Sequence, residues 1–357
     1  PGERVRHPMA EALFSSMLAT ADLPIEIDRP AGGFNGGLAL ALDEVFRADA
    51  MDLLRRVILR GFTRRLDSLL GHDATIGGLE VDFPRGVLAF TDVTLRKTGG
   101  TATTPFLHIA RLEVIVEPSI LDPKIETYKK VVLHQPRFFL IVDHSEAGTQ
   151  RSIDPEWLDK VSALPYPTDE LRVIDGQVEY RDETTTPPSR FVLSGLEVSA
   201  AKLARAATDP DRRGATVSAR ALVMGESTLK VDAAFTPGAS PIDGELHLAL
   251  APIQLARLNG LLRSRFSIDV STGTLGLSAD LDAQDGQVTG TLTPSLSEVS
   301  VLGVKEADIT RPLLELLIEL RLKRLDGVPL QIEVDTGPEM LKNLPVALLQ
   351  AIREVRR

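Results

Sequence analysis

The chain has 357 residues and a formal net charge of -10 at neutral pH, enough length for one elongated domain or two compact ones. The excess of carboxylates argues against a general nucleic-acid-binding protein, because such proteins neutralise phosphates with clustered Lys and Arg. The sequence contains no cysteine, which excludes disulfides, thiolate nucleophiles and cysteine-ligated zinc.

Residues 1–47 form a poorly patterned lead-in with a glycine-rich loop at 31–37. A helix is predicted over about 38–70, because apolar residues recur at helical spacing and Gly71 provides a stop. No window approaches the ~18 uninterrupted apolar residues of a transmembrane helix. An anchoring segment upstream of Pro1, which would associate the protein with a membrane, is compatible with the sequence.

Three arginines of this helix, Arg56, Arg60 and Arg64, recur every four residues and form a basic stripe. Such a stripe is typical of a helix that lies on an anionic membrane surface. It is equally typical of the solvated face of a helix whose other face packs on a domain. Both interpretations stay open, and the three arginines are our candidate membrane-surface residues.

Residues 48–144 are interpreted as this helix plus a first β-layer, because apolar and polar residues begin to alternate. The pair Gln135-Pro136 is expected to interrupt the pattern, since proline suits a strand start or an edge. The predicted strands are 75–83, 87–96, 106–117, 130–134 and 137–143.

Residues 145–168 are predicted to be a linker helix, and residues 169–308 a second β-layer with a short amphipathic helix at 253–263. Alternation in this layer predicts one apolar and one polar face. The apolar face offers a smooth aliphatic lining for acyl chains, or it closes a core against the chain's own helices. The candidate groove-lining residues are Leu229, Val231, Phe235, Leu246, Leu248, Leu250, Leu275, Leu277, Val288 and Leu292.

Residues 309–357 are predicted to form a helix, a strand and a second helix. The first helix, Pro312–Leu325, is rich in leucine around more than one stripe, so it must be covered on more than one side. A strand over 328–334 and a helix over about 338–356 complete the chain.

Catalytic and metal-binding motifs are missing from the sequence. The six histidines lack the H-x-x-x-H and H-x-H spacings of a preorganised metal site. There is neither a G-x-S-x-G elbow nor a P-loop, and acidic pairs fall at turns or on polar strand faces. We therefore expect no enzyme activity, no catalytic residue, no metal and no cofactor.

Two segments share a pattern. Gly86–Asp92 and Gly176–Asp182 both read G-x-apolar-x-aromatic-x-D, and a Leu-Glu-Val triplet follows each about one strand later. Shared turn residues alone would not reproduce this order. The sequence therefore predicts two related β-layers.

The strand Leu171–Asp182, its sequel Phe191–Val198 and the block Pro241–Thr293 resemble the strand pattern of AsmA-like envelope proteins of Gram-negative bacteria. The likeness covers about residues 48–300 and rests on pattern and spacing. The resemblance implies a long, curved antiparallel sheet with an apolar groove and a non-enzymatic protein of the periplasm. It also implies a role in phospholipid transport or outer-membrane biogenesis, with an anchor in the inner membrane.

The expected fold is thus mainly β with flanking helices (α+β), an elongated, curved antiparallel sheet that forms an apolar groove. The expected partners are phospholipid acyl chains and other envelope proteins, without nucleic acid. The alternative function is a scaffold subunit of a larger envelope-spanning assembly, whose groove is closed by its own helices.

Overall fold

The computed structural model describes a chain that is mostly β-sheet. The residues described are 52–53, 55–64, 66, 72–82, 85–115, 128–150, 168–203, 214–236, 243–266, 268–284, 287–304 and 332–336. The lead-in 1–47, most of the expected linker and the two helices expected after residue 309 lie outside them.

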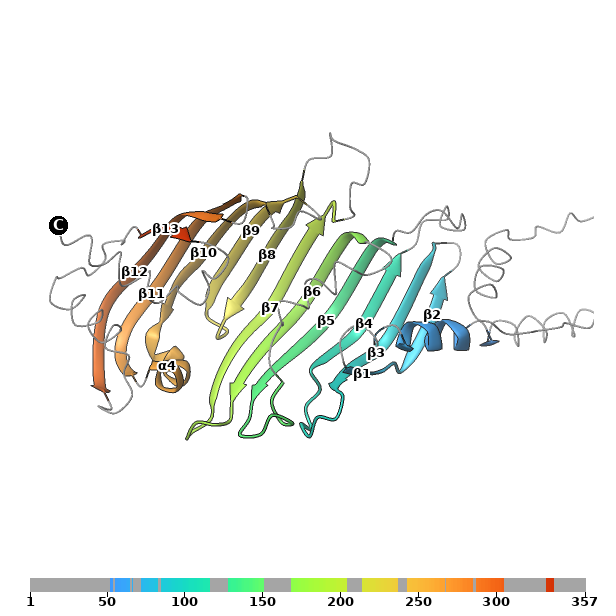
Figure 1. Ribbon diagram of the computed structural model, residues 1–357, viewed down its shortest axis with the longest axis horizontal. Coiled ribbons are helices and arrows are strands. Elements are labelled where there is room, and N and C mark those ends of the chain that lie inside the picture. Colours follow the sequence, from blue (N-terminus) through green and yellow to red (C-terminus); the bar gives the residue numbers. More distant parts are fainter. Residues whose placement is uncertain are drawn as a thin grey trace, which may run out of the picture.

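One 13-stranded sheet runs through the molecule. Its strands follow one another in chain order from β3 to β13, while β1 and β2 both pair with β3. Figure 1 shows them side by side in one long, curved and open sheet, which confirms the predicted fold class. The strands are β1 (His72–Thr75), β2 (Gly78–Asp82), β3 (Val87–Lys97), β4 (Leu107–Ile115), β5 (Tyr128–Val142), β6 (Thr168–Asp182), β7 (Ser189–Ala201), β8 (Ala215–Val223), β9 (Ser227–Phe235), β10 (Gly244–Gln254), β11 (Ile268–Gln284), β12 (Gln287–Val304) and β13 (Ile332–Thr336).

One neighbouring pair departs from the antiparallel pattern. Strands β5 and β6 run parallel, with Leu133 opposite Val173. Parallel neighbours need a crossover connection instead of a hairpin, and residues 143–167 supply it. The two β-layers expected from the repeated pattern are therefore the two halves of one sheet, joined edge to edge.

The strand break predicted at Gln135-Pro136 is wrong, because β5 runs without interruption through both residues. Pro136 is fully buried opposite Ile109 of β4, while Gln135 takes a positive φ of 50°. The pairing of β5 with both neighbouring strands keeps its register across these two residues.

Gln135 belongs to a line of irregular positions that crosses the first half of the sheet. Asp92, Gln135, Asp175 and Gly195, on β3, β5, β6 and β7, all have φ between 50° and 56°. The amide Nε2 of Gln135 donates a hydrogen bond of 3.1 Å to Oδ2 of Asp175. The positions on β6 and β7 coincide with shifts of the pairing register, and bulges of this kind raise the local twist and bend a sheet.

Among the described residues, helices flank the sheet at two places. A helix at residues 52–66 lies beside β1 to β3, and the short helices η2 (Leu255–Leu258) and α4 (Asn259–Phe266) follow β10 (Figure 1). The helical segment after β10 begins two residues later than the helix predicted at 253–263, because Ile253 and Gln254 still pair with β11. Within the described ranges, none of the helices has the length and apolarity needed to cross a bilayer.

Candidate functional site

The pairing register sorts the side chains of the sheet onto two faces. Successive residues of a strand point to opposite faces, and directly paired residues share one. A first row of directly paired residues crosses the sheet from β2 to β12 and consists only of apolar side chains. The row is Leu79, Phe90, Leu112, Leu133, Val173, Val198, Ala219, Val231, Leu248, Ala279 and Leu292.

A second row without polar side chains runs beside the first: Val81, Leu88, Val114, Val131, Leu171, Ala200, Val217, Ala233, Leu246, Leu281 and Gly290. We call the face that carries both rows the apolar face. Because neighbouring strands lie roughly 4.8 Å apart, each row is on the order of 50 Å long. This exceeds the ~30 Å hydrocarbon thickness of a bilayer.

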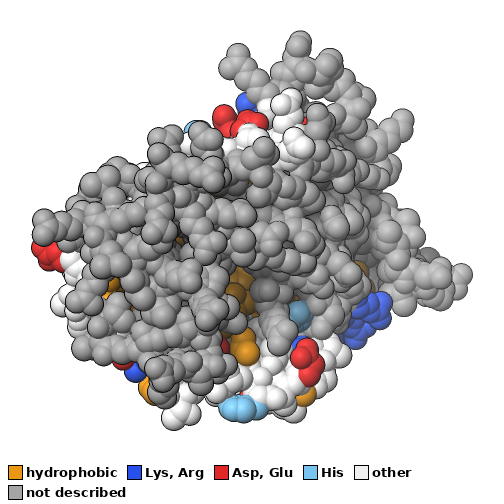
Figure 2. Space-filling view, turned by 60° about the vertical axis from the view of Figure 1, so that its left-hand side comes forward, with side chains coloured by type: hydrophobic (Ala, Val, Ile, Leu, Met, Phe, Trp, Pro, Cys, Tyr) orange, Lys and Arg blue, Asp and Glu red, His pale blue; other side chains and the backbone are white. Residues whose placement is uncertain are grey.

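All ten predicted groove-lining residues lie on the apolar face, in β9 to β12. Leu248 pairs with Val231 on one side and Ala279 on the other. In the central strands these side chains are half-buried, with polar neighbours exposed on the other face. Figure 2 shows hydrophobic side chains of the described residues in a recess, with charged side chains and a histidine near its lower edge. Their role in holding a ligand stays a prediction.

One end of the apolar face is covered by the helix at residues 52–66. Phe62 of the helix stacks on Phe90 of β3, with ring centroids 4.1 Å apart and ring planes 12° apart. Phe90 is fully buried, and Ile58 joins the same cluster. The first row is therefore closed from solvent where it reaches β3.

Near β11 and β12 the apolar face is covered by η2 and α4. Leu255 is buried in a cluster with Val270, and Leu258, Leu262, Leu275 and Leu296 pack around it. The side chain of Asn259 holds the helix in place, because its Nδ2 donates to the carbonyl of Val270 at 2.7 Å and its Oδ1 accepts from the same residue's N–H at 3.0 Å.

The basic stripe lies on the outer side of the helix at residues 52–66. Arg56, Arg60 and Arg64 are all exposed, whereas Ile58 and Phe62 face the sheet. This orientation satisfies both interpretations of the stripe, since a solvated face and a membrane-facing one are equally exposed.

The opposite, polar face carries charge clusters that sequence patterns did not predict. The carboxylate of Glu179 is 3% exposed and lies 2.8 Å from Nε of Arg190, with Arg181 bonded to it as well. Burial raises the pKa of Glu179, but the hydrogen bonds from Arg190 and Arg181 outweigh it and leave the pKa below the ordinary value. The cluster is self-contained and holds β6 to β7.

A second cluster joins β2, β4 and β5. The guanidinium of Arg111 contacts Glu80 at 2.7 Å and Glu113 at 2.8 Å, and His134 lies 3.7 Å from Glu113. The hydrogen bond from Arg111 is the largest effect on Glu113 and lowers its pKa despite partial burial. These carboxylates serve ion pairs within the sheet.

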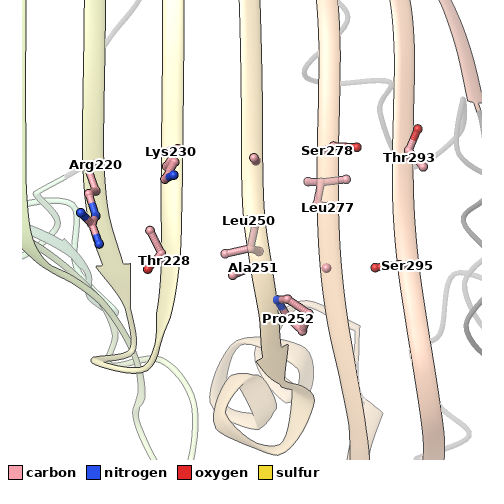
Figure 3. Close-up of a pocket in the computed structure, with 12 residues that line it drawn as sticks. Arg220, Thr228, Lys230, Leu250, Ala251, Pro252, Leu277, Ser278, Thr293 and Ser295 are labelled. Atoms are coloured by element: carbon pink, nitrogen blue, oxygen red, sulfur yellow. The ribbon is translucent and has the colours of Figure 1, made fainter.

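The polar face is hollowed over β8 to β12, and we call this depression the polar hollow. Its volume is about 550 Å³. Arg220, Lys230, Ala249, Ser278 and Thr293 form one directly paired row across it. Leu250 and Leu277 border it as well. Figure 3 shows the two cations on neighbouring strands at one side and Ser278, Thr293 and Ser295 at the other.

Comparisons with known proteins give no family for the chain. No protein-family model matches the sequence, and no curated protein matches it.

Proposed function

We propose that the protein binds phospholipid acyl chains along its apolar face. In this proposal it is a non-enzymatic periplasmic component of the bacterial envelope that acts in phospholipid handling or outer-membrane biogenesis. The observation that carries the proposal is the pair of apolar rows, which contain no polar side chain and are half-buried in β8 to β10, between the two ends that the chain's own helices cover.

An acyl chain that slides along the sheet contacts the side chains of the apolar rows one strand after another. Each methylene removed from water contributes about 0.8 kcal/mol, so a half-buried aliphatic strip favours an alkyl chain. A polar side chain within the strip would be stripped of water by the passing chain at a cost of several kcal/mol. Neither row contains such a group, so the chain meets no polar barrier from strand to strand. The absence of cysteine suits an oxidising periplasm.

The test is native mass spectrometry of the gently purified protein together with lipid extraction from the same sample. Leu248→Asp and Leu246→Asp each place a carboxylate in one apolar row. The matched control is Thr216→Asp, because Thr216 neighbours Val217 of the second row but is exposed on the polar face, outside the polar hollow. Circular dichroism verifies that all three variants fold. Co-purified phospholipid that is lost in the two leucine variants and kept in the control supports the proposal.

The second candidate is a scaffold subunit of a larger envelope assembly. The packing of Phe62 on Phe90 favours it, because the chain's own helix there closes the apolar face as a core would. A lipid-free protein that purifies with other proteins at fixed stoichiometry would establish the scaffold and contradict lipid binding.

A further inference from the structure

The polar hollow combines two cations that the register places side by side. Arg220 of β8 and Lys230 of β9 are direct cross-strand partners, and both are exposed. Like charges placed directly opposite one another destabilise a sheet. This chain carries a net charge of -10, so an uncompensated pair of cations is unusual on its surface.

Within the described ranges, neither cation has a carboxylate within ion-pairing distance of 4.0 Å. Glu197 of β7 is the register partner of Arg220. Its Oε1, however, accepts a hydrogen bond of 3.0 Å from the backbone N–H of Asp175, in the line of bulges. One oxygen of this carboxylate is thereby bonded to the backbone of β6.

The middle of the hollow is lined by small residues, so its floor is open. Ala249, Ala251 and Gly276 separate the cations from the hydroxyls of Thr293 and Ser295. A Cβ at position 276 would lie 2.5 Å from Oγ of Ser295, so only glycine leaves that hydroxyl where it is.

The floor is shaped by a bulge in β10, where the register shifts between Leu250 and Ile253. The bulge is fixed from the neighbouring strand, because Oγ of the buried Ser227 donates a hydrogen bond of 2.7 Å to the carbonyl of Pro252. A buried anchor of this kind gives the depression a set shape.

We propose that the polar hollow binds a small phosphate ester of a polyol or sugar. The phosphate lies against Arg220 and Lys230, since a guanidinium and an ammonium both match its oxygens and its charge. The uncharged part lies over the small floor formed by Ala249, Ala251 and Gly276. The row that carries the two cations is on the opposite face from the apolar rows, although Leu250 and Leu277, two of the predicted groove-lining residues, also border the hollow.

The surroundings of the hollow select for a small ligand. Farther along the same face, the register row that follows carries Asp232, His247 and Asp280, and Glu245 and Asp282 lie in the row beyond. These carboxylates repel an extended polyanion along the sheet, whereas a single phosphate at Arg220 and Lys230 has only Glu197, opposite Arg220, and Asp232, two residues from Lys230, beside it.

The experiment is isothermal titration calorimetry of the full chain with inorganic phosphate and with glycerol 3-phosphate, alongside flotation with vesicles that contain phosphatidylglycerol. The variants are Arg220→Gln, Lys230→Gln and Ala249→Asp. Arg172→Gln is the matched control, because Arg172 is an exposed cation of the same face on β6, outside the hollow.

We expect glycerol 3-phosphate to bind more tightly than inorganic phosphate, each glutamine variant to weaken it about tenfold, and the control to leave it unchanged. Vesicle binding that depends on the same two cations would assign the phosphate to a lipid headgroup and would also support the site. Equal affinities in all variants, or no binding of any probe at millimolar concentration, would overturn the proposal. Ala249→Asp should abolish phosphate binding, and a variant that still binds phosphate would also contradict the proposal.

Discussion

Phe62 and Phe90 stack face to face, with ring centroids 4.1 Å apart, and this contact fastens the helix at residues 52–66 onto the first apolar row. Phe90 is the residue of β3 in that row, and it is fully buried beneath the helix. The same contact decides whether the row is open or closed at β3. The first prediction therefore concerns the effect of removing this contact on stability.

Phe62→Ala should lower the free energy of unfolding by about 2–3 kcal/mol, less than the loss of a fully buried phenylalanine because Phe62 is half-buried. Urea denaturation followed by circular dichroism measures it. Arg60→Ala, on the exposed side of the same helix, is the control and should stay within about 0.5 kcal/mol of the parent. Equal effects of the two changes would show that the stacking contributes nothing.

Two glycines should respond in opposite ways to alanine. Gly61 is exposed in the helix, and an added Cβ would meet nothing within 4 Å, so Gly61→Ala should stabilise the fold by about 0.5–1 kcal/mol. Gly195 has a φ of +56° in the line of bulges, so Gly195→Ala should cost about 1 kcal/mol. Thermal unfolding of both variants measures the difference. A gain at Gly195 would mean that the bulge relaxes.

Alternation along single strands was enough to predict the apolar face. In Leu246, Leu248 and Leu250 the period of two fixes a shared face, whatever strand lies beside it. The parallel pairing of β5 with β6 has no comparable local pattern, because it depends on a crossover of many residues. The proline at position 136 led to the wrong prediction of a strand break, because the sequence does not show that β4 and β6 pair with β5 on both sides of it.

The polar hollow could not be predicted from the sequence either, because its residues come from five different strands. Arg220 and Thr293 are separated by four strand-to-strand steps, and only the complete register brings them into one row. The bulge at Ala251-Pro252 that shapes the floor follows from pairing with β11. In the sequence, Arg220 and Lys230 each alternate with apolar residues. This alternation places each cation on a polar face but does not show that the two lie side by side.

The basic stripe gives a prediction about membranes. If Arg56, Arg60 and Arg64 face an anionic bilayer, changing all three to Gln should weaken co-sedimentation with phosphatidylglycerol vesicles by about fivefold per residue, because each cation near such a surface contributes about 1 kcal/mol. The effect should fade with added salt. Arg96→Gln, an exposed cation of β3 outside the helix, is the control. Unchanged sedimentation would leave the stripe as a solvated helix face.

Glu179 should make the fold sensitive to acid. Burial raises its pKa, but the bonds from Arg190 and Arg181 win and hold it below the ordinary value of 4.5. A carboxylate with a lower pKa in the folded chain stabilises the fold above the unfolded-state pKa and loses that contribution as the pH falls through the folded one.

The expected result is an unfolding free energy that declines below about pH 5 and a smaller decline in Glu179→Gln. At neutral pH the same variant should be less stable by about 1–2 kcal/mol, because Arg181 and Arg190 lose charge-assisted hydrogen bonds but remain partly exposed to water. Urea denaturation at several pH values measures both effects. An identical acid profile in parent and variant would place the sensitivity elsewhere, with Glu113 as the next carboxylate of lowered pKa.

His247 gives the last prediction, with the opposite sign. Its Nδ1 lies 2.7 Å from Oδ1 of Asp280, and this hydrogen bond raises its pKa above the ordinary 6.5, helped by Asp232 and Glu245 on the same face. A raised pKa means that the charged imidazole stabilises the fold below the unfolded-state value and that the contribution is lost as the pH rises through the folded one.

NMR titration of the His247 ring protons should therefore give a pKa above 6.5 in the parent and a lower one in Asp280→Asn. Asp282→Asn is the matched control, because it removes a carboxylate from the same strand and face without touching the imidazole contact. The pKa should fall clearly more in Asp280→Asn than in the control, since a direct hydrogen bond outweighs a screened charge at longer range. Equal shifts in the two variants would mean that the acidic face acts through its total charge and that the 2.7 Å contact adds nothing of its own.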